Sequence, residues 1–256
     1  MAEDVGSGDV TTEACVPAAD RARGIFLARE PMTVAGSELL REIFAGEELE
    51  LLVSSGDPVE RGAVIARVSG LTRRLLTLER TALNFLQRLS GIATAGSRLV
   101  GEVEGTGCRV LDTRKTTPGL RRLEKLATRA GGVTNHRMGL YDAVLIKNNH
   151  IAAAGGVRQA LERCRGSGLP VKVEVRTREE LAEALDCGAQ HLLLDNMSPE
   201  QARASVAHVA GRAKIEISGG ITLSNARAYA ESGADFISSG AMTHSARAMD
   251  ISFRLE

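Results

Sequence analysis

The spacing of hydrophobic positions changes near residue 105, and the change divides the chain into two parts. Before it, short alternating segments bounded by turn residues predict strands at 23–29, 48–53 and 63–68. The stretch 76–100 carries apolar residues at helical spacing and predicts one long helix, although Gly91 and Gly96 weaken the prediction that it is continuous. The first part is therefore expected to combine a sheet with a long helix.

Beyond residue 105, strand and helix patterns alternate. Short apolar runs predict six strands, at 109–111, 143–146, 171–175, 191–194, 214–217 and 236–237. The segments between them carry helix signals, including capping boxes at 177–180 and 198–201, and Pro118 is expected in the first turn of a helix. Nearly continuous apolar strands separated by helices indicate a parallel sheet covered on both faces. Six or seven such strands predict an incomplete (β/α) barrel. A doubly wound open sheet is the alternative, but no G-x-G-x-x-G follows the first strand.

Composition excludes several classes of protein. Charged residues make up 25% and hydrophobic residues 43%, as in ordinary globular chains, and the formal net charge of zero attracts neither nucleic acid nor an anionic membrane. The four cysteines form no C-x-x-C pair, which favours reduced thiols in a cytosol. The first nine residues are polar and rich in glycine, so we expect no signal peptide. No apolar run approaches the roughly 20 residues that span a bilayer. We therefore expect a cytoplasmic protein that binds neither nucleic acid nor membrane.

Polar residues follow each predicted strand of the second part. They lie at 112–115, 147–150, 174, 195–196, 218–220 and 238–240, and the loop 135–137 precedes the second strand. In parallel α/β barrels the carboxyl ends of the strands line the active site, and small-residue loops after the last strands commonly bind phosphate through backbone N–H groups. The set combines four or five cations with two separated carboxylates. It predicts a pocket for a polyanionic substrate.

Individual residues in this set also allow ordinary structural interpretations. Arg114 and Lys115 alone are typical of solvated loop charges, and His136 is equally typical of a loop residue and of a catalyst. Lys147 directly follows a buried apolar run, where an unpaired lysine is costly, so a functional role is favoured. It is also the candidate nucleophile of an alternative class, a Schiff-base barrel enzyme that needs no metal.

Two further hypotheses concern carboxylates and carrier domains. Glu174 and Asp195 are suited to hold Mg²⁺, which prefers one or two carboxylates together with substrate oxygens. Residues 56–66 resemble the half-repeats of lipoyl or biotinyl carriers, but no lysine precedes Lys115, so no lysine there accepts the prosthetic group. A swinging-arm carrier is therefore excluded.

Seven ordered motifs resemble the quinolinate phosphoribosyltransferase family (nicotinate-nucleotide diphosphorylase, carboxylating). They are EDVGSGDVTT at 3–12, ERTALNFLQRLSG at 79–91, DTRKTTPG at 112–119, NHRMGL at 135–140, LIKNNHI at 145–151, LDNMS at 194–198 and SGGI at 218–221. The similarity runs essentially from end to end. Family members carry a helical segment before the first motif, so we expect a shortened lineage or a misassigned start.

The resemblance implies a domain organisation and a reaction. It implies an N-terminal α/β sandwich domain with a linking helix at 1–105, an α/β barrel at 106–245 and a C-terminal segment at 246–256 that returns to the first domain. The implied protein is a homodimer or higher even oligomer. The implied reaction transfers the phosphoribosyl group of PRPP to quinolinate with Mg²⁺, giving nicotinate mononucleotide, diphosphate and CO₂ in NAD biosynthesis. A paralogue that uses another pyridine carboxylate or related acceptor is the alternative.

The resemblance also assigns roles to matching residues. The pocket for the quinolinate carboxylates and the PRPP diphosphate matches Arg114, Lys115, His136, Arg137 and Lys147. Arg80 matches an arginine donated across the dimer, and Glu174 and Asp195 match the carboxylates near the ribose and Mg²⁺. The 5′-phosphate cradle matches Ser218, Gly219, Gly220 and Gly240, with Ser239 and His244 beside it as further substrate-binding residues. The expected catalytic residues are Lys115, Lys147, Glu174 and Asp195.

Overall fold

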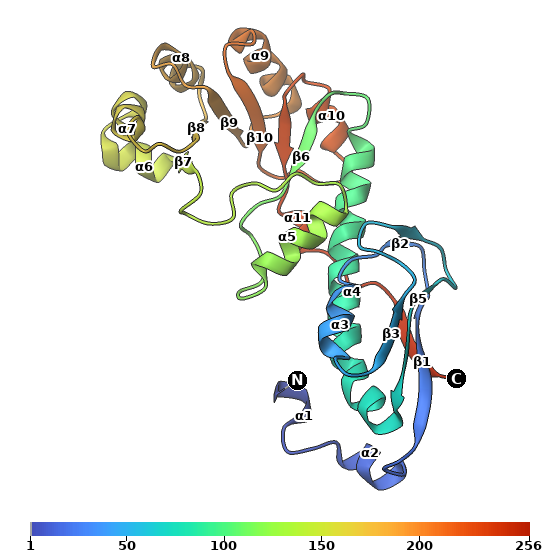
Figure 1. Ribbon diagram of the computed structural model, residues 1–256. Helices are drawn as coiled ribbons and strands as arrows, with labels where there is room; N and C mark the ends of the chain where they lie inside the picture. The colour runs from blue at the N-terminus through green and yellow to red at the C-terminus, as the bar shows by residue number, and fades with distance from the viewer. Residues whose placement is uncertain (1) are drawn as a thin grey trace. The chain divides into compact units, whose positions relative to one another are not determined.

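The computed structural model describes residues 2–256, which form two compact units (Figure 1). The first unit comprises the chain up to Ser97, Leu123–Gly132 and Ala246–Glu256, and the second comprises Arg98–Arg122 and Val133–Ser245. The sequence-based division placed residues 98–105 with the first part and 123–132 with the barrel. The difference at 123–132 has a physical cause, because Ala127 packs in one buried cluster with Leu89 and Ile92.

The first unit is built on a four-stranded antiparallel sheet. Its strands, in the order β12-β1-β5-β3, are Ile251–Leu255, Arg21–Ala28, Val64–Leu71 and Glu48–Leu51. A two-stranded sheet pairs β2 (Met32–Thr33) with β4 (Pro58–Val59), and the helices are α1 (Ala2–Val5), α2 (Val10–Cys15), α3 (Leu39–Ile43) and most of α4 (Thr72–Glu102). One hydrophobic core joins sheet and helices through Phe26, Leu40, Ile65 and Leu86.

Helix α4 runs without a break through both glycines that weakened its prediction. At Gly91 an added Cβ would lie 1.9 Å from the carbonyl oxygen of Arg247. The absence of a side chain at Gly91 therefore allows the C-terminal segment to pack directly against the helix. Glycine inside a helix is about 1 kcal/mol less favourable than alanine, but at this position only glycine leaves room for the neighbouring backbone.

The second unit contains a six-stranded parallel sheet in the order β6-β11-β10-β9-β8-β7. The strands are β6 (Arg109–Leu111), β7 (Val144–Ile146), β8 (Val171–Val175), β9 (His191–Asp195), β10 (Lys214–Ser218) and β11 (Phe236–Ser238). Each lies within one residue of its prediction. Consecutive strands are neighbours and the first lies beside the last, which is the cyclic order of a barrel. Because β6 and β7 do not pair within the described part of the chain, the barrel is incomplete, and the predicted fold class is confirmed.

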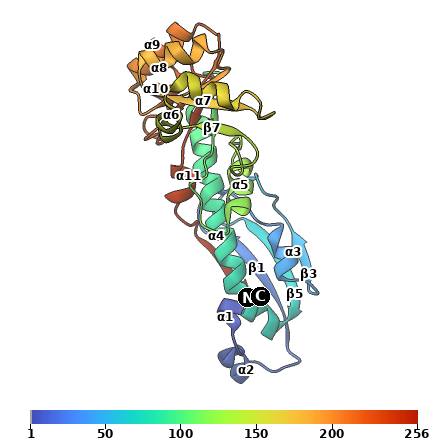
Figure 2. The same ribbon diagram turned by 90° about the vertical axis from the view of Figure 1, so that its left-hand side faces the viewer.

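Helices connect these strands and lie around them (Figure 2). They are α6 (Asn148–Ala154), α7 (Val157–Cys164), α8 (Arg178–Asp186), α9 (Pro199–Val209), α10 (Ala226–Ala230) and α11 (Ala241–His244), while α5 (Arg121–Ala130) falls mostly in the first unit. The capping box at Ser198 and Gln201 is confirmed. At the start of α8 Thr177 accepts the N–H of Glu180, but the Glu180 carboxylate accepts the N–H of Arg176 instead of completing the box.

The prediction for Pro118 is wrong. Helix α5 begins three residues later, at Arg121, because residues 117–120 form a turn in which the Leu120 N–H donates to the Thr117 carbonyl. Gly119 adopts a φ of +80° in this turn, a conformation that ends helical geometry. Across residues 2–256, no helix combines the length and apolar character needed to cross a bilayer.

Candidate active site

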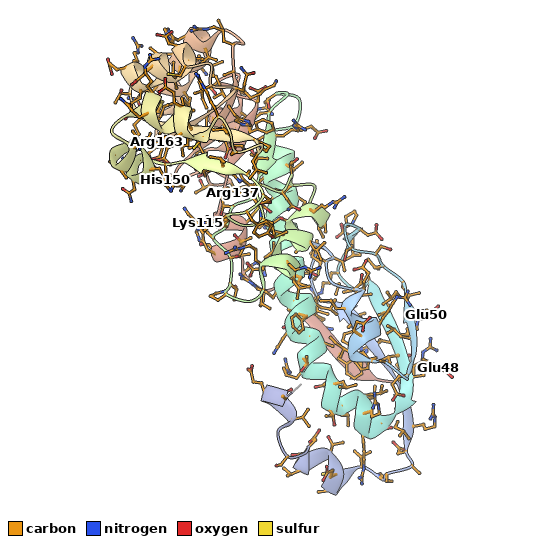
Figure 3. The ribbon with its side chains drawn as sticks, turned by 60° about the vertical axis from the view of Figure 1, so that its left-hand side comes forward. Glu48, Glu50, Lys115, Arg137, His150 and Arg163 are labelled. Carbon is orange, nitrogen blue, oxygen red and sulfur yellow. The ribbon has the colours of Figure 1, made fainter. Side chains whose placement is uncertain are left out.

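A cavity of about 490 Å³ lies within the second unit, at the carboxyl ends of the parallel strands. The predicted site residues that line it are Arg114, Lys115, His136, Arg137, Lys147, Glu174, Asp195, Ser218, Gly219, Gly220, Ser239, Gly240 and His244. Figure 3 marks two of its cations, Lys115 after β6 and Arg137 in the loop before β7. Arg80 is not among the lining residues and lies on α4 in the first unit.

Asp112 organises one wall of the cavity from below. Its side chain is fully buried, and it accepts hydrogen bonds from Asn135 Nδ2 at 2.7 Å and from the backbone N–H of His136 at 2.8 Å. These bonds tie the end of β6 to the loop that carries His136 and Arg137. The sequence interpretation placed Asp112 in the motif but gave it no role. Its position directly after an apolar strand was the available signal.

The ring of His136 is held by protein groups at both nitrogens. Nδ1 accepts the backbone N–H of Arg137 at 2.8 Å, while Nε2 lies 3.3 Å from Lys172 Nζ and 3.5 Å from Glu216 Oε1. The Arg137 guanidinium donates to the Ala143 carbonyl at 2.8 Å. Burial, followed by the nearby charge of Arg114, lowers the pKa of Arg137. The loop is thus fixed before any substrate arrives.

A buried ion pair that the sequence did not predict lies at the cavity, with Glu216 among the lining residues. Lys172 Nζ on β8 is 2.6 Å from Glu216 Oε2 on β10, and the two side chains are 14% and 1% exposed. Burial opposes ionisation of Glu216, but the hydrogen bond and charge of His136, together with Lys172, outweigh it and lower the pKa to about 2. Burial and the charge of Lys172 lower the pKa of His191 to about 4, so His191 is neutral at pH 7.

The signal for this pair was present in the sequence. Lys172 and Glu216 each interrupt an apolar strand, which is the same argument that singled out Lys147. The sequence pattern alone does not connect Lys172 with Glu216, because the order of strands in the sheet depends on contacts between distant segments. The structure pairs Lys172 on β8 with Glu216 on β10, two strands away in the sheet.

Glu174 and Asp195 form a second acidic group, at the rim of the cavity. The guanidinium of Arg176 reaches both of them, with Nη2 3.4 Å from Glu174 Oε1 and 3.1 Å from Asp195 Oδ2. One cation therefore contacts both carboxylates, as a shared metal ion requires. Among residues 2–256 no cluster of three or more His, Cys, Asp or Glu side chains is arranged to hold a metal. Two hard oxygen donors fit Mg²⁺ that completes its shell with substrate oxygens and water.

Two small-residue loops close the other side of the cavity. Gly219 has a φ of +107°, and an added Cβ would lie 2.3 Å from Asn196 Oδ1. In the neighbouring loop an added Cβ at Gly240 would lie 2.9 Å from Lys115 Cδ. The Thr243 hydroxyl donates to the Lys115 carbonyl at 2.7 Å and fixes the backbone of that lysine. Backbone this close to the cavity is suited to bind phosphate oxygens through N–H groups.

The parallel barrel and the polar cavity at its strand ends are together typical of an α/β-barrel enzyme that acts on anionic substrates. Two family descriptions match the chain: the N-terminal domain of quinolinate phosphoribosyl transferase over residues 9–90 and its C-terminal domain over residues 92–254. The chain belongs to the quinolinate phosphoribosyltransferase family.

Individual relatives agree with this assignment. The probable nicotinate-nucleotide pyrophosphorylase [carboxylating] of Bacillus subtilis (strain 168) is 40% identical, over 98% of this chain and 89% of the relative. The nicotinate-nucleotide pyrophosphorylase [carboxylating] of Mycobacterium leprae (strain TN) is 42% identical, over 99% and 93%. The crystal structure of NadC from Streptococcus pyogenes superposes with a TM-score of 0.93 at 38% identity, covering 99% of this chain and 92% of that one. A nicotinate-nucleotide pyrophosphorylase from Ehrlichia chaffeensis gives a TM-score of 0.96 at 34% identity, covering 100% and 95%.

Proposed function

We propose that this protein transfers the phosphoribosyl group of PRPP to quinolinate with decarboxylation, forming nicotinate mononucleotide, diphosphate and CO₂ in NAD biosynthesis. The observation that carries the proposal is the cavity itself. Cations from three separate loops converge there with two carboxylates and two small-residue loops. Relatives that carry this activity in their names match the chain over nearly its full length.

We assign different lining residues of the cavity to the two substrates. Arg114 and Arg137 are the residues we assign to the quinolinate carboxylates, because guanidinium forks match carboxylate geometry. Lys147 supplies a further charge to the same region, with His136 as part of its wall. Lys115 lies against the loop at Gly240, so we assign it to the phosphate groups of PRPP.

The reaction that we propose begins with loss of diphosphate from the ribose C1, which leaves an oxocarbenium-like centre. Glu174 and Asp195 stabilise the positive charge that develops there, and the preorganised cations stabilise the leaving group. These two carboxylates would also hold Mg²⁺, which would supply further positive charge to the departing diphosphate. The quinolinate nitrogen attacks C1 and becomes positively charged. That charge stabilises the electron pair left on the ring carbon when the adjacent carboxylate departs as CO₂, and a proton from water then adds to this carbon.

The direct test is turnover by the purified protein. With Mg²⁺, PRPP and quinolinate we expect CO₂ and diphosphate in equal amounts, and we expect Lys147→Ala to lose roughly 100-fold or more in rate, as removal of one preorganised charge typically does. Turnover with nicotinate or another acid, but none with quinolinate, would support the paralogue instead. Trapping of a carbonyl substrate on Lys147 by borohydride would support the Schiff-base alternative.

We also propose a cytoplasmic homodimer in which Arg80 completes the partner's site. The supporting observation is that Arg80 lies outside the set of residues that line the cavity, although its motif matches a substrate-binding arginine. An Arg80→Ala chain mixed with a Lys147→Ala chain should regain part of the activity, because hybrid dimers contain one intact site. No recovery despite demonstrated subunit exchange would contradict the shared site.

A further inference from the structure

Arg176 follows β8 and places its guanidinium between the two carboxylates at the rim of the cavity. Nη2 lies 3.1 Å from Asp195 Oδ2 and Nε lies 3.2 Å from the same oxygen, while Nη2 is 3.4 Å from Glu174 Oε1. The Arg176 side chain is 49% exposed, whereas those of Glu174 and Asp195 are 7% and 16% exposed. A cation on a long, accessible stem thus neutralises two mostly buried acids.

Neighbouring groups hold this arrangement in place. With its amide nitrogen directed at Glu174 Oε1 (3.0 Å), the Asn148 side chain turns its oxygen to Arg176 Nη2 (2.8 Å). The backbone N–H of Arg176 donates to Glu180 Oε2 at 2.7 Å. Glu180 belongs to the first turn of α8, so the backbone of Arg176 is fixed. The half-exposed side chain has solvent beside it, into which it can turn when the guanidinium leaves the two carboxylates.

We propose that Arg176 occupies, in the substrate-free protein, the position that Mg²⁺ takes during turnover, and so restricts the metal to entering together with PRPP. The inference rests on the proposed function, in which Glu174 and Asp195 hold that metal. A free ion has to displace the guanidinium and shed water, which Mg²⁺ does reluctantly. A metal that arrives with PRPP brings phosphate oxygens of its own.

PRPP also offers Arg176 a new partner. Phosphate oxygens accept a guanidinium fork at least as well as carboxylates do, so the side chain can turn from Glu174 and Asp195 to the diphosphate. Metal and PRPP then bind cooperatively, and the coupling is reciprocal: each raises the affinity for the other by the same factor. Arg176 acts here as a positioning residue that makes the two events depend on each other.

The test measures Mn²⁺ binding to the free protein by electron paramagnetic resonance, without PRPP. We expect Arg176→Gln to bind Mn²⁺ at least about tenfold more tightly than the unchanged protein, within the range usual for coupled sites. The double variant Arg176→Gln with Glu174→Gln should lose this increase in Mn²⁺ affinity, because one of the two carboxylates is gone. Arg178→Gln removes an exposed arginine two residues away and is the matched control, which should leave Mn²⁺ affinity unchanged. With PRPP present, the difference between Arg176→Gln and the unchanged protein should shrink.

Two results would overturn the inference. One is equal Mn²⁺ affinity of Arg176→Gln and the unchanged protein, with folding verified by circular dichroism. The other is that the unchanged protein binds Mn²⁺ as tightly without PRPP as with it. Turnover of quinolinate by the unchanged protein, measured on the same preparation, separates the two proposals. Absent turnover defeats the proposed function, whereas normal turnover with unaltered Mn²⁺ binding in Arg176→Gln defeats only the role of Arg176.

Discussion

Replacing Lys172 with methionine should destabilise the second unit strongly, because it leaves the carboxylate of Glu216 buried without its nearest cation. The two side chains are 14% and 1% exposed, so solvent screens the pair poorly. Removing one partner of a buried ion pair typically costs about 3–5 kcal/mol. The pKa of Glu216, lowered from 4.5 to about 2, corresponds to roughly 3 kcal/mol of stabilisation of the charged form at neutral pH. His136 contributes more to that value than Lys172 does, so the value is an upper limit on what Lys172 supplies. The expected loss of about 3 kcal/mol therefore follows from the cost of removing one partner of a buried ion pair.

The companion variant is Lys172→Met with Glu216→Leu, which removes both charges. Replacement of a buried ion pair by apolar residues of similar volume is often neutral, so this double variant should lie within about 1–2 kcal/mol of the unchanged protein. It should therefore be more stable than Lys172→Met alone. The second mutation restores stability only if the unpaired carboxylate, and not lost packing, causes the defect.

Hydrogen exchange read by mass spectrometry is the suitable assay. The chain contains no tryptophan, and its two compact units need separate readings, which peptides from β8 and β10 provide for the second unit. If the double variant exchanges as fast as Lys172→Met or faster, the explanation through an unpaired buried charge is refuted.

The same pair predicts a pH dependence. Because the pKa of Glu216 is depressed on folding, its contribution to stability is complete above 4.5 and is lost as the pH falls towards 2. The stability gap between the unchanged protein and Lys172→Met should therefore stay constant from pH 8 to 6 and narrow below about 4.5. A gap that widens in acid would contradict the sign of this effect.

Three further substitutions test other parts of the site and fold. Gly219→Ala places a Cβ 2.3 Å from Asn196 Oδ1 at a residue with a φ of +107°. It should raise the KM for PRPP about tenfold or more, which corresponds to a loss of about 1.4 kcal/mol in binding free energy. The control Gly166→Ala, whose added Cβ meets no atom within 4 Å, should leave the KM unchanged. Asp112→Asn weakens the anchor of the His136 loop and should lower kcat/KM roughly 100-fold in steady-state assays with little change in fold by circular dichroism. Ser198→Ala removes a helix cap and should cost about 1 kcal/mol by thermal unfolding, and a fall in activity would mean that the cap also supports the site.

Much of the second unit could be predicted because each of its strands is specified by a few consecutive residues. Each parallel strand is a short apolar run, and the residue that follows such a run must lie at the carboxyl edge of the sheet. Lys147, Glu174 and Asp195 were located in this way, and the cavity brings them together. The same reasoning did not decide between a cyclic barrel and an open sheet, because the order of strands depends on pairing between distant segments.

The features that the sequence did not reveal depend on contacts between distant residues. Glu216 and Lys172 lie 44 positions apart, and only the register of β8, β9 and β10 brings them together. Arg176 was given no role in the predicted site, since nothing in the local sequence shows that Asp195 lies beside it. Helix α5 was assigned to the barrel by its position in the chain, whereas the packing of Ala127 places it in the first unit.

The pairing of β1 with β12 has a consequence for synthesis on the ribosome. Strand β1 ends at Ala28 and its neighbour β12 begins at Ile251, so one edge of the first sheet has no partner until almost the entire chain has been made. At 5–20 residues per second that interval lasts roughly 10–50 s. The second unit, whose strands are contiguous in the chain, is finished earlier. Loss of the last few residues would leave β1 as a permanent open edge and invite association with other chains.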